Sequence, residues 1–166
     1  MNKVFNITGL CFPNEHYMAD VSKKLERVMA MVEQGYYFII NRPRQYGKTT
    51  TLYTISDALQ KKGNYIVLNT SFEGVGDLIF GNEKVFSNGF VSILEKYATA
   101  YAPILVPWLK SKRDEIQNLD ELSLLITKMV SRTDKKIVLM IDEVDKSSNN
   151  QLFISFLAML RNKYLE

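Results

Sequence analysis

The stretch of sequence that decides the fold spans residues 36–50 and reads YYFIINRPRQYGKTT. Its apolar beginning predicts a buried strand, its middle a loop, and its end the start of a helix. That helix should run from Lys48 to about Lys62 and stop at Gly63. Its buried face is indicated by three residues at helical spacing, Leu52, Ile55 and Leu59. A strand that enters a helix through such a loop is typical of a phosphate-binding site.

The last residues of this stretch carry the chemistry. Gly47 lets backbone amides turn toward a phosphate, and Lys48 can reach the β- and γ-phosphates of a nucleotide. The hydroxyl of Thr49 can bind Mg²⁺. We therefore expect Lys48 to be catalytic as well as nucleotide-binding and Thr49 to be a metal ligand. The expected nucleotide-binding residues are Arg44, Gln45, Tyr46, Gly47, Lys48, Thr49 and Thr50.

One position departs from the usual pattern, G-x-x-x-x-G-K-[ST], because Arg42 stands where that pattern has its first glycine. A Gly-Lys-Thr tripeptide alone is a weak signal, and its plain alternative is a surface turn with a solvated lysine. The predicted strand before it and helix after it favour the phosphate site. Arg44 has two open roles, either contacting the γ-phosphate or bracing the loop.

A second element, residues 135–143, reads KKIVLMIDE and has the form of a Walker B strand. Its continuous apolar run suits a parallel strand, which would place two carboxylates at the carboxyl end of the sheet, where ligands of open α/β folds bind. Asp142 would hold Mg²⁺ through water, and Glu143 would orient and activate the attacking water. The alternative is an acidic pair that merely begins a loop.

Composition predicts one ordinary soluble domain covering residues 1–166, with 46% hydrophobic residues and a net charge of +3. That balance does not call for nucleic acid as a partner. The single cysteine, Cys11, cannot form an internal disulfide, so we expect a small buried residue in a reducing cytoplasm. No apolar stretch is long enough to span a membrane, and no signal-peptide core is present. His16, the one histidine, is expected to be structural.

The remaining pattern predicts further elements of an α/β fold with a parallel sheet. Residues 65–69 form a second strand, and the aromatic stripe of residues 86–101 a helix whose ring-bearing face belongs to the core. The basic residues Lys110, Lys112 and Arg113 should be a solvated face, and Asp145 should cap the last helix. The other expected helices cover residues 21–34, 120–131 and 148–166.

Three motifs together resemble the AAA-ATPase-like family of bacteria and archaea, P-loop nucleotide triphosphatases with an additional catalytic glutamate. They are HYMAD at residues 16–20, RPRQYGKT at residues 42–49, and the apolar strand ending in Asp142 and Glu143. The resemblance implies ATP and Mg²⁺ as ligands and a three-layer α/β/α fold. It also makes Arg42 a family trait and places residues 14–17 beside the adenine.

The family's strand order, 5-1-4-3-2, implies a central strand after the helix at residues 148–166, with a polar sensor residue. The sequence ends at that helix, so we expect an N-terminal portion of a longer protein, incomplete at its C-terminus. Relatives often carry a restriction-endonuclease-like domain further along. Such a domain, or a partner protein, would then be outside this sequence.

Two functions follow from these residues. The first is an ATPase that drives a conformational switch in a longer protein or partner. The second is a nucleotide-binding module without turnover, lacking the arginine that contributes about 10³ to 10⁵ in rate. A small-molecule kinase is a weaker third reading, since no arginine-rich lid is evident. Adenine over guanine rests on the resemblance and on the absence of an Asn-Lys-x-Asp element.

Overall fold

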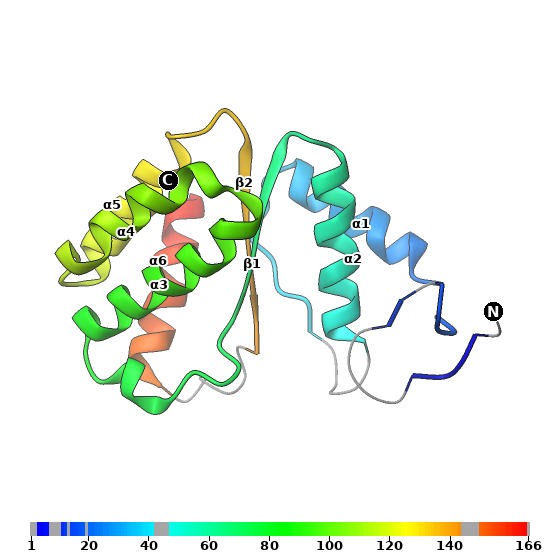
Figure 1. The fold of residues 1–166 in the computed structure, drawn as a ribbon, viewed down its shortest axis with the longest axis horizontal. Coiled ribbons are helices and arrows are strands. Elements are labelled where there is room, and N and C mark those ends of the chain that lie inside the picture. Colours follow the sequence, from blue (N-terminus) through cyan, green and yellow to red (C-terminus); the bar gives the residue numbers. More distant parts are fainter. Residues whose placement is uncertain are drawn as a thin grey trace. The chain divides into compact units, whose positions relative to one another are not determined.

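A computed structural model describes residues 3–6, 11–12, 14–18, 20–41, 47–143 and 150–165. The chain divides into two compact units, an N-terminal unit, Met1–Gly63, and a C-terminal unit, Asn64–Glu166. Within the described residues the fold comprises six α-helices and one two-stranded parallel sheet (Figure 1). The α/β class predicted from the sequence is therefore confirmed.

The N-terminal unit contains two helices, α1 (Ser22–Glu33) and α2 (Lys48–Lys61), which pack against each other. Each is followed within two residues by a glycine with a positive φ, Gly35 after α1 and Gly63, the predicted stop, after α2. The buried face predicted for α2 is confirmed, because its three residues are buried: Leu52, Ile55 and Leu59. Pattern and packing therefore agree for α2.

The predicted strand before the phosphate loop is absent. Residues 36–41 have no strand assignment, and their side chains are largely exposed, 52% for Tyr36 and 81% for Ile39. The prediction of a buried strand here is therefore wrong. A strand needs a neighbouring strand to hydrogen-bond its backbone N–H and C=O groups. Among the described residues the one ladder joins two other segments. The N–H of Tyr36 instead bonds the carbonyl of Met31, in the last turn of α1.

The C-terminal unit is built on that ladder, formed by β1 (Tyr65–Ser71) and β2 (Lys136–Asp142). The strands run parallel, and the register pairs Tyr65 with Lys136 and Ser71 with Asp142. Both strands were predicted, and both are confirmed. Alternate side chains face opposite sides of a sheet. One face enters the hydrophobic core through Ile66, Leu68, Ile137, Leu139 and Ile141; the other carries Val67, Asn69, Ser71, Met140 and Asp142.

Helices connect and cover these strands, because parallel strands need a long crossover. Between β1 and β2 lie η1 (Asp77–Phe80), α3 (Glu83–Tyr101), η2 (Pro103–Leu105), α4 (Val106–Lys112), η3 (Arg113–Glu115) and α5 (Leu119–Val130); α6 (Gln151–Leu165) follows β2. Asparagine side chains cap the N-termini of α3, α5 and α6. In each, the asparagine Oδ1 accepts a hydrogen bond of 2.9 Å from a backbone N–H of the first turn: Asn82 from Val85, Asn118 from Glu121 and Asn150 from Leu152. In Figure 1 the α-helices of this unit lie on one side of the two strands.

Aromatic rings fill the core under these helices. Phe86, Phe90, Phe153 and Phe156 have no exposed surface, and ring centroids in the cluster lie as close as 4.6 Å, between Phe90 and Phe156. Phe72, which directly follows β1, joins them. Phe86 and Phe90 of the predicted stripe on α3 are therefore core, whereas Tyr101 at its end is 44% exposed.

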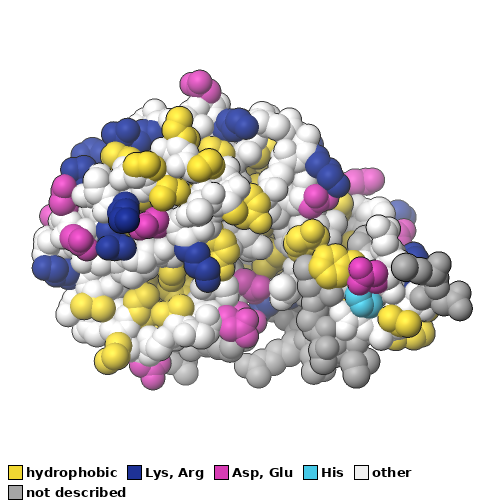
Figure 2. Space-filling view, viewed as in Figure 1, with side chains coloured by type: hydrophobic (Ala, Val, Ile, Leu, Met, Phe, Trp, Pro, Cys, Tyr) yellow, Lys and Arg dark blue, Asp and Glu magenta, His cyan; other side chains and the backbone are white. Residues whose placement is uncertain are grey.

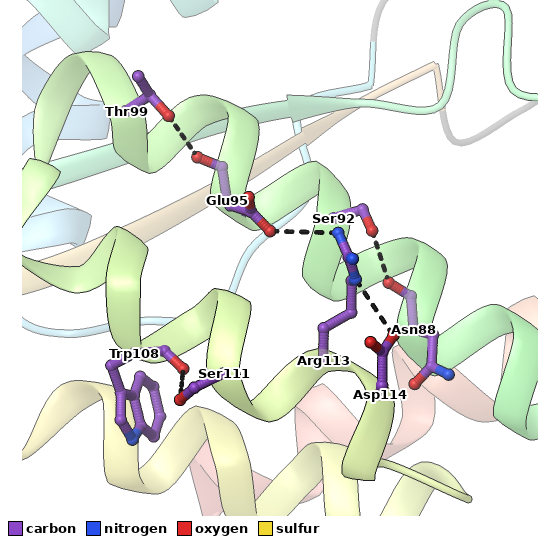
Figure 3. A network of polar contacts seen from close by, with 8 residues as sticks. All are labelled: Asn88, Ser92, Glu95, Thr99, Trp108, Ser111, Arg113 and Asp114. Atoms are coloured by element: carbon purple, nitrogen blue, oxygen red, sulfur yellow. Dashed lines mark hydrogen bonds and ion pairs between the residues drawn. The ribbon is translucent and has the colours of Figure 1, made fainter.

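The basic residues predicted to form a solvated face lie on α4 and η3, and some of them form ion pairs. Lys110 is exposed, but Arg113 lies 3.5 Å from Glu95 on α3 and 3.4 Å from Asp114 (Figure 3). Arg132 also stacks on the ring of Trp108, with 4.5 Å to its centroid. Figure 2 shows basic and acidic side chains interspersed over the visible face of the C-terminal unit. That mixed surface provides no single-sign field for a highly charged partner.

Candidate functional site

The phosphate-binding half of the candidate site lies in the N-terminal unit, at the start of α2. Gly47 has a φ of 69°, in the left-handed region, and immediately precedes the helix. Lys48 and Thr49 are its first two residues, and the first helical bond runs from the N–H of Thr51 to the carbonyl of Gly47. Amides of a first helical turn are not used within the helix and carry the positive end of its dipole. The Gly-Lys-Thr sequence thus occupies a position suited to a phosphate.

Several predicted residues lie outside the described part of the chain. These are Arg42, Arg44, Gln45 and Tyr46, which precede Gly47 in the sequence, and Asp145, which follows Glu143 by two residues. Their expected roles on the nucleotide and at the last helix remain predictions.

Thr50 connects α2 to the N-terminal lead-in. Its Oγ1 accepts a hydrogen bond of 3.2 Å from the backbone N–H of Cys11. Cys11 is half-buried and borders a groove of about 280 Å³ along α2, whose other lining residues are Phe12, Asn14, Tyr53, Thr54, Asp57 and Lys61. The rings of Phe12 and Tyr53 meet edge to face at 6.1 Å. The groove therefore combines aromatic walls with an amide and an ion pair.

That ion pair joins Lys61 to Asp57 one turn earlier, with 2.7 Å between Nζ and Oδ2. The hydrogen bond and charge of Asp57 raise the pKa of the Lys61 ammonium. His16 has a structural task in the lead-in, as expected. Its Nδ1 accepts from the N–H of Phe12 at 3.0 Å, and its backbone bridges to Val4.

The carboxylate half of the site lies in the C-terminal unit, at the carboxyl end of β2. Asp142 is the last residue of the strand and is only 9% exposed. Its Oδ1 accepts from the N–H of Glu143 at 2.8 Å, and its carbonyl accepts from the N–H of Phe72 at 3.4 Å. A buried carboxylate at the end of a parallel strand is where the sequence predicted a metal ligand.

Glu143 is held in an unusual conformation. Its φ is 58°, and no other non-glycine residue in the described part of the chain has a positive φ. Such a residue costs about 1–3 kcal/mol and persists where the surroundings demand it, commonly at functional sites. The strain coincides with the residue predicted to be the general base.

Sequence reasoning missed Asn69, on the strand beside β2. Its Oδ1 is buried and has no hydrogen-bond partner in the described structure. Buried polar atoms are nearly always bonded, so an exception calls for an explanation. The available signal was an asparagine near the carboxyl end of the otherwise apolar run YIVLN.

The donor set fits Mg²⁺ more readily than a metal that needs several protein ligands. In the ranges that the structure covers, no group of three or more His, Cys, Asp and Glu side chains is arranged to hold a metal. Mg²⁺ takes one or two carboxylates plus water and phosphate oxygens. The buried carboxylate of Asp142 and the unbonded amide oxygen of Asn69 meet that requirement on one face of one sheet.

A second groove, of about 370 Å³, follows the carboxyl end of β1. Its lining residues are Ser71, Glu73, Gly74, Val75, Ile93, Lys96 and Tyr97. Ser71 accepts from the N–H of Glu73, which shapes the turn out of the strand, and Lys96 lies 5.7 Å from the ring centre of Tyr97. The groove is open and its charges are mixed, so its residues suggest no defined ligand.

The predicted site residues thus form two sets, each assembled within its own unit. Gly47, Lys48, Thr49 and Thr50 lie together at the start of α2, and Asp142 and Glu143 lie together after β2. Of the described helices, none has the length and apolar character required to cross a membrane. Comparison with protein-family models, with curated proteins and with solved structures found no match to this chain.

Proposed function

We propose that this chain binds ATP with Mg²⁺ and hydrolyses it, driving a conformational switch in a longer protein or a partner. The observation that carries the proposal is the Gly-Lys-Thr sequence at residues 47–49, in which Gly47 is left-handed and Lys48 and Thr49 begin α2. The buried Asp142 and strained Glu143 after a parallel strand provide independent support. The motifs shared with the AAA-ATPase-like family, a P-loop group, support the same function.

The proposal gives each residue a defined task. Backbone amides at the start of α2 bind phosphate oxygens, and the ammonium of Lys48 stabilises negative charge on the β- and γ-phosphates. Thr49 and Asp142 hold Mg²⁺, which when bound neutralises charge on the phosphates. Glu143 orients the attacking water and accepts its proton. Phosphoryl transfer is mostly positioning and charge stabilisation, so few groups suffice.

The groove beside α2 supports a nucleotide over inorganic phosphate alone. It begins at Cys11, whose N–H is fixed by Thr50 within the first turn of the helix. Phe12 and Tyr53 offer ring surfaces to a flat base, and Asn14 offers an amide that can donate and accept. The proposal therefore places the base in this groove and the phosphates at the helix start.

The decisive test of binding is the thermal unfolding midpoint with and without Mg-ATP. A ligand that binds only the folded state at 100 times its Kd adds about 2.7 kcal/mol of stability. We expect a raised midpoint in the parent, no rise in Lys48→Ala, and a normal rise in Lys24→Ala, which removes an exposed lysine of α1. An unchanged midpoint in the parent would refute nucleotide binding.

Turnover separates an ATPase from a module that only binds. Glu143→Gln preserves shape but removes the base, so we expect it to retain the Mg-ATP response while phosphate release falls at least 100-fold. If the parent shows the thermal response but releases no phosphate, the binding module is the correct function. If Glu143→Gln keeps the parent's rate, Glu143 is not the base.

A further inference from the structure

The unbonded oxygen of Asn69 lies on the same sheet face as Asp142. In the parallel register Asn69 stands opposite Met140, and the next residue on its face, Ser71, stands opposite Asp142. The core-facing positions of β1 are the intervening residues, Ile66 and Leu68. Asn69 therefore points away from the aromatic core, toward the face that carries the predicted metal ligand.

The spacing of the two side chains favours a bridge over a direct contact. Strands lie about 4.8 Å apart and rise about 3.3 Å per residue, so the Cα atoms of Asn69 and Asp142 are on the order of 8 Å apart. Parallel-facing side chains at that separation do not bond directly but are within reach of a bridging water. Both side chains present oxygen acceptors, which a hydrated cation satisfies better than any single donor.

We propose that Asn69 is a positioning residue of the magnesium site, whose Oδ1 accepts a hydrogen bond from a water on the Mg²⁺ held by Asp142. The inference rests on the proposed function, because the metal arrives with ATP. It explains why a buried acceptor is left unbonded in the protein alone. It also assigns a role to an asparagine in an apolar strand, where leucine would be more stable.

The test compares four full-length chains: the parent, Asn69→Leu, Asn69→Asp and Thr70→Val. For each, the unfolding midpoint is measured without nucleotide, with ATP and EDTA, and with ATP across a Mg²⁺ titration. Thr70 is the matched control, because its Oγ1 donates to the carbonyl of Met140 at 2.9 Å and its side chain faces the core. Thr70→Val removes a hydroxyl beside Asn69 without altering the metal-facing surface.

Asn69→Leu is expected to raise the midpoint without nucleotide, since it removes an unbonded buried acceptor. Its half-maximal Mg²⁺ concentration should rise about 10- to 100-fold, the usual effect of losing a group that holds a metal-bound water. Asn69→Asp restores an acceptor oxygen and should return that concentration to within a few-fold of the parent. Thr70→Val should lower the midpoint and leave the Mg²⁺ dependence unchanged.

Four outcomes would overturn the inference. Equal Mg²⁺ dependence in Asn69→Leu and the parent excludes Asn69 from the metal site. Equal loss in the Leu and Asp variants shows that the amide's packing matters and its acceptor does not. A lower midpoint for Asn69→Leu without nucleotide shows that the oxygen is bonded in the folded protein. A parent that ignores ATP altogether refutes the proposed function, and this inference with it.

Discussion

At the scale of single residues, two departures from local rules occur at the same end of the sheet. Glu143 adopts a backbone conformation that suits glycine, and Asn69 buries an unbonded oxygen. Each lowers the stability of the folded state, and natural proteins usually accept such costs at functional sites. The proposed nucleotide binding and water activation would provide one physical reason for both.

The strain at Glu143 can be measured without any ligand. Glu143→Gly and Glu143→Ala both remove the side chain, so their difference isolates the backbone. At an unstrained position alanine is about 0.4–1 kcal/mol more stable than glycine. At a φ of 58° we expect the opposite order, with Glu143→Gly more stable by about 1 kcal/mol in urea unfolding. Alanine being the more stable would show that no strain is stored there.

The start of α1 should respond to acid. Asp20 accepts hydrogen bonds from the hydroxyl and the N–H of Ser22, and these lower the pKa of its carboxyl. A carboxyl whose pKa is lower in the folded protein contributes stability above its unfolded pKa, about 3.9, and loses it as pH falls through the folded value.

Removing that carboxyl should therefore have its full effect above about pH 4 and a progressively smaller effect below it. Asp20→Ala is expected to lower the thermal midpoint at pH 7, with the difference from the parent shrinking as pH falls below about 4. Midpoints measured from pH 2.5 to 7 provide the test. A constant difference at every pH would assign the effect to packing instead of charge. Ser22→Ala removes the hydroxyl donor and should show a smaller change with the same pH profile.

At the scale of elements, local pattern predicted the helices well and one strand badly. The heptad-like spacing of α2 and the apolar runs of β1 and β2 each match what the structure shows. Residues 36–41 are as apolar as either strand, yet most of their side chains are exposed and they join no strand ladder in the described structure. A helix satisfies its own backbone groups, whereas a strand depends on a neighbour that pattern alone cannot supply.

Helix α5 provides a matched pair of leucines for testing its buried face. Leu122 is fully buried and Leu124 is 53% exposed, and both lie within the same helix. Leu122→Ala should cost about 2–5 kcal/mol through lost burial and a cavity. Leu124→Ala should change stability by about 0.5 kcal/mol or less. Similar costs for the two variants in urea unfolding would mean that α5 is rotated relative to the described packing.

At the scale of the whole molecule, the two units differ in how much core they hold. The hydrophobic cluster of the C-terminal unit includes both strands and helices α3 to α6. The buried residues described in the N-terminal unit are few: Val32, Thr51, Leu52, Ile55, Ser56 and Leu59. A chain segment of that size is marginal without a substantial core.

We therefore expect residues 64–166, produced alone, to unfold cooperatively, and residues 1–63 alone to show no cooperative transition. Circular dichroism during urea unfolding distinguishes the two, since cooperativity marks a core that is complete within the segment. A cooperative transition in residues 1–63 would contradict this expectation. Loss of cooperativity in residues 64–166 would show that its core needs the rest of the chain.

The sequence by itself determined the elements whose stability is local and the chemistry of the residues at their ends. Spacing and glycine stops predicted α2, apolar runs predicted β1 and β2, and residue type identified Lys48, Thr49, Asp142 and Glu143 as candidates. Tertiary structure alone decided the strand register, the strain at Glu143, the unbonded oxygen of Asn69 and, among the described residues, the exclusion of residues 36–41 from the strand ladder. Those features depend on contacts between residues distant in sequence, which no local pattern encodes.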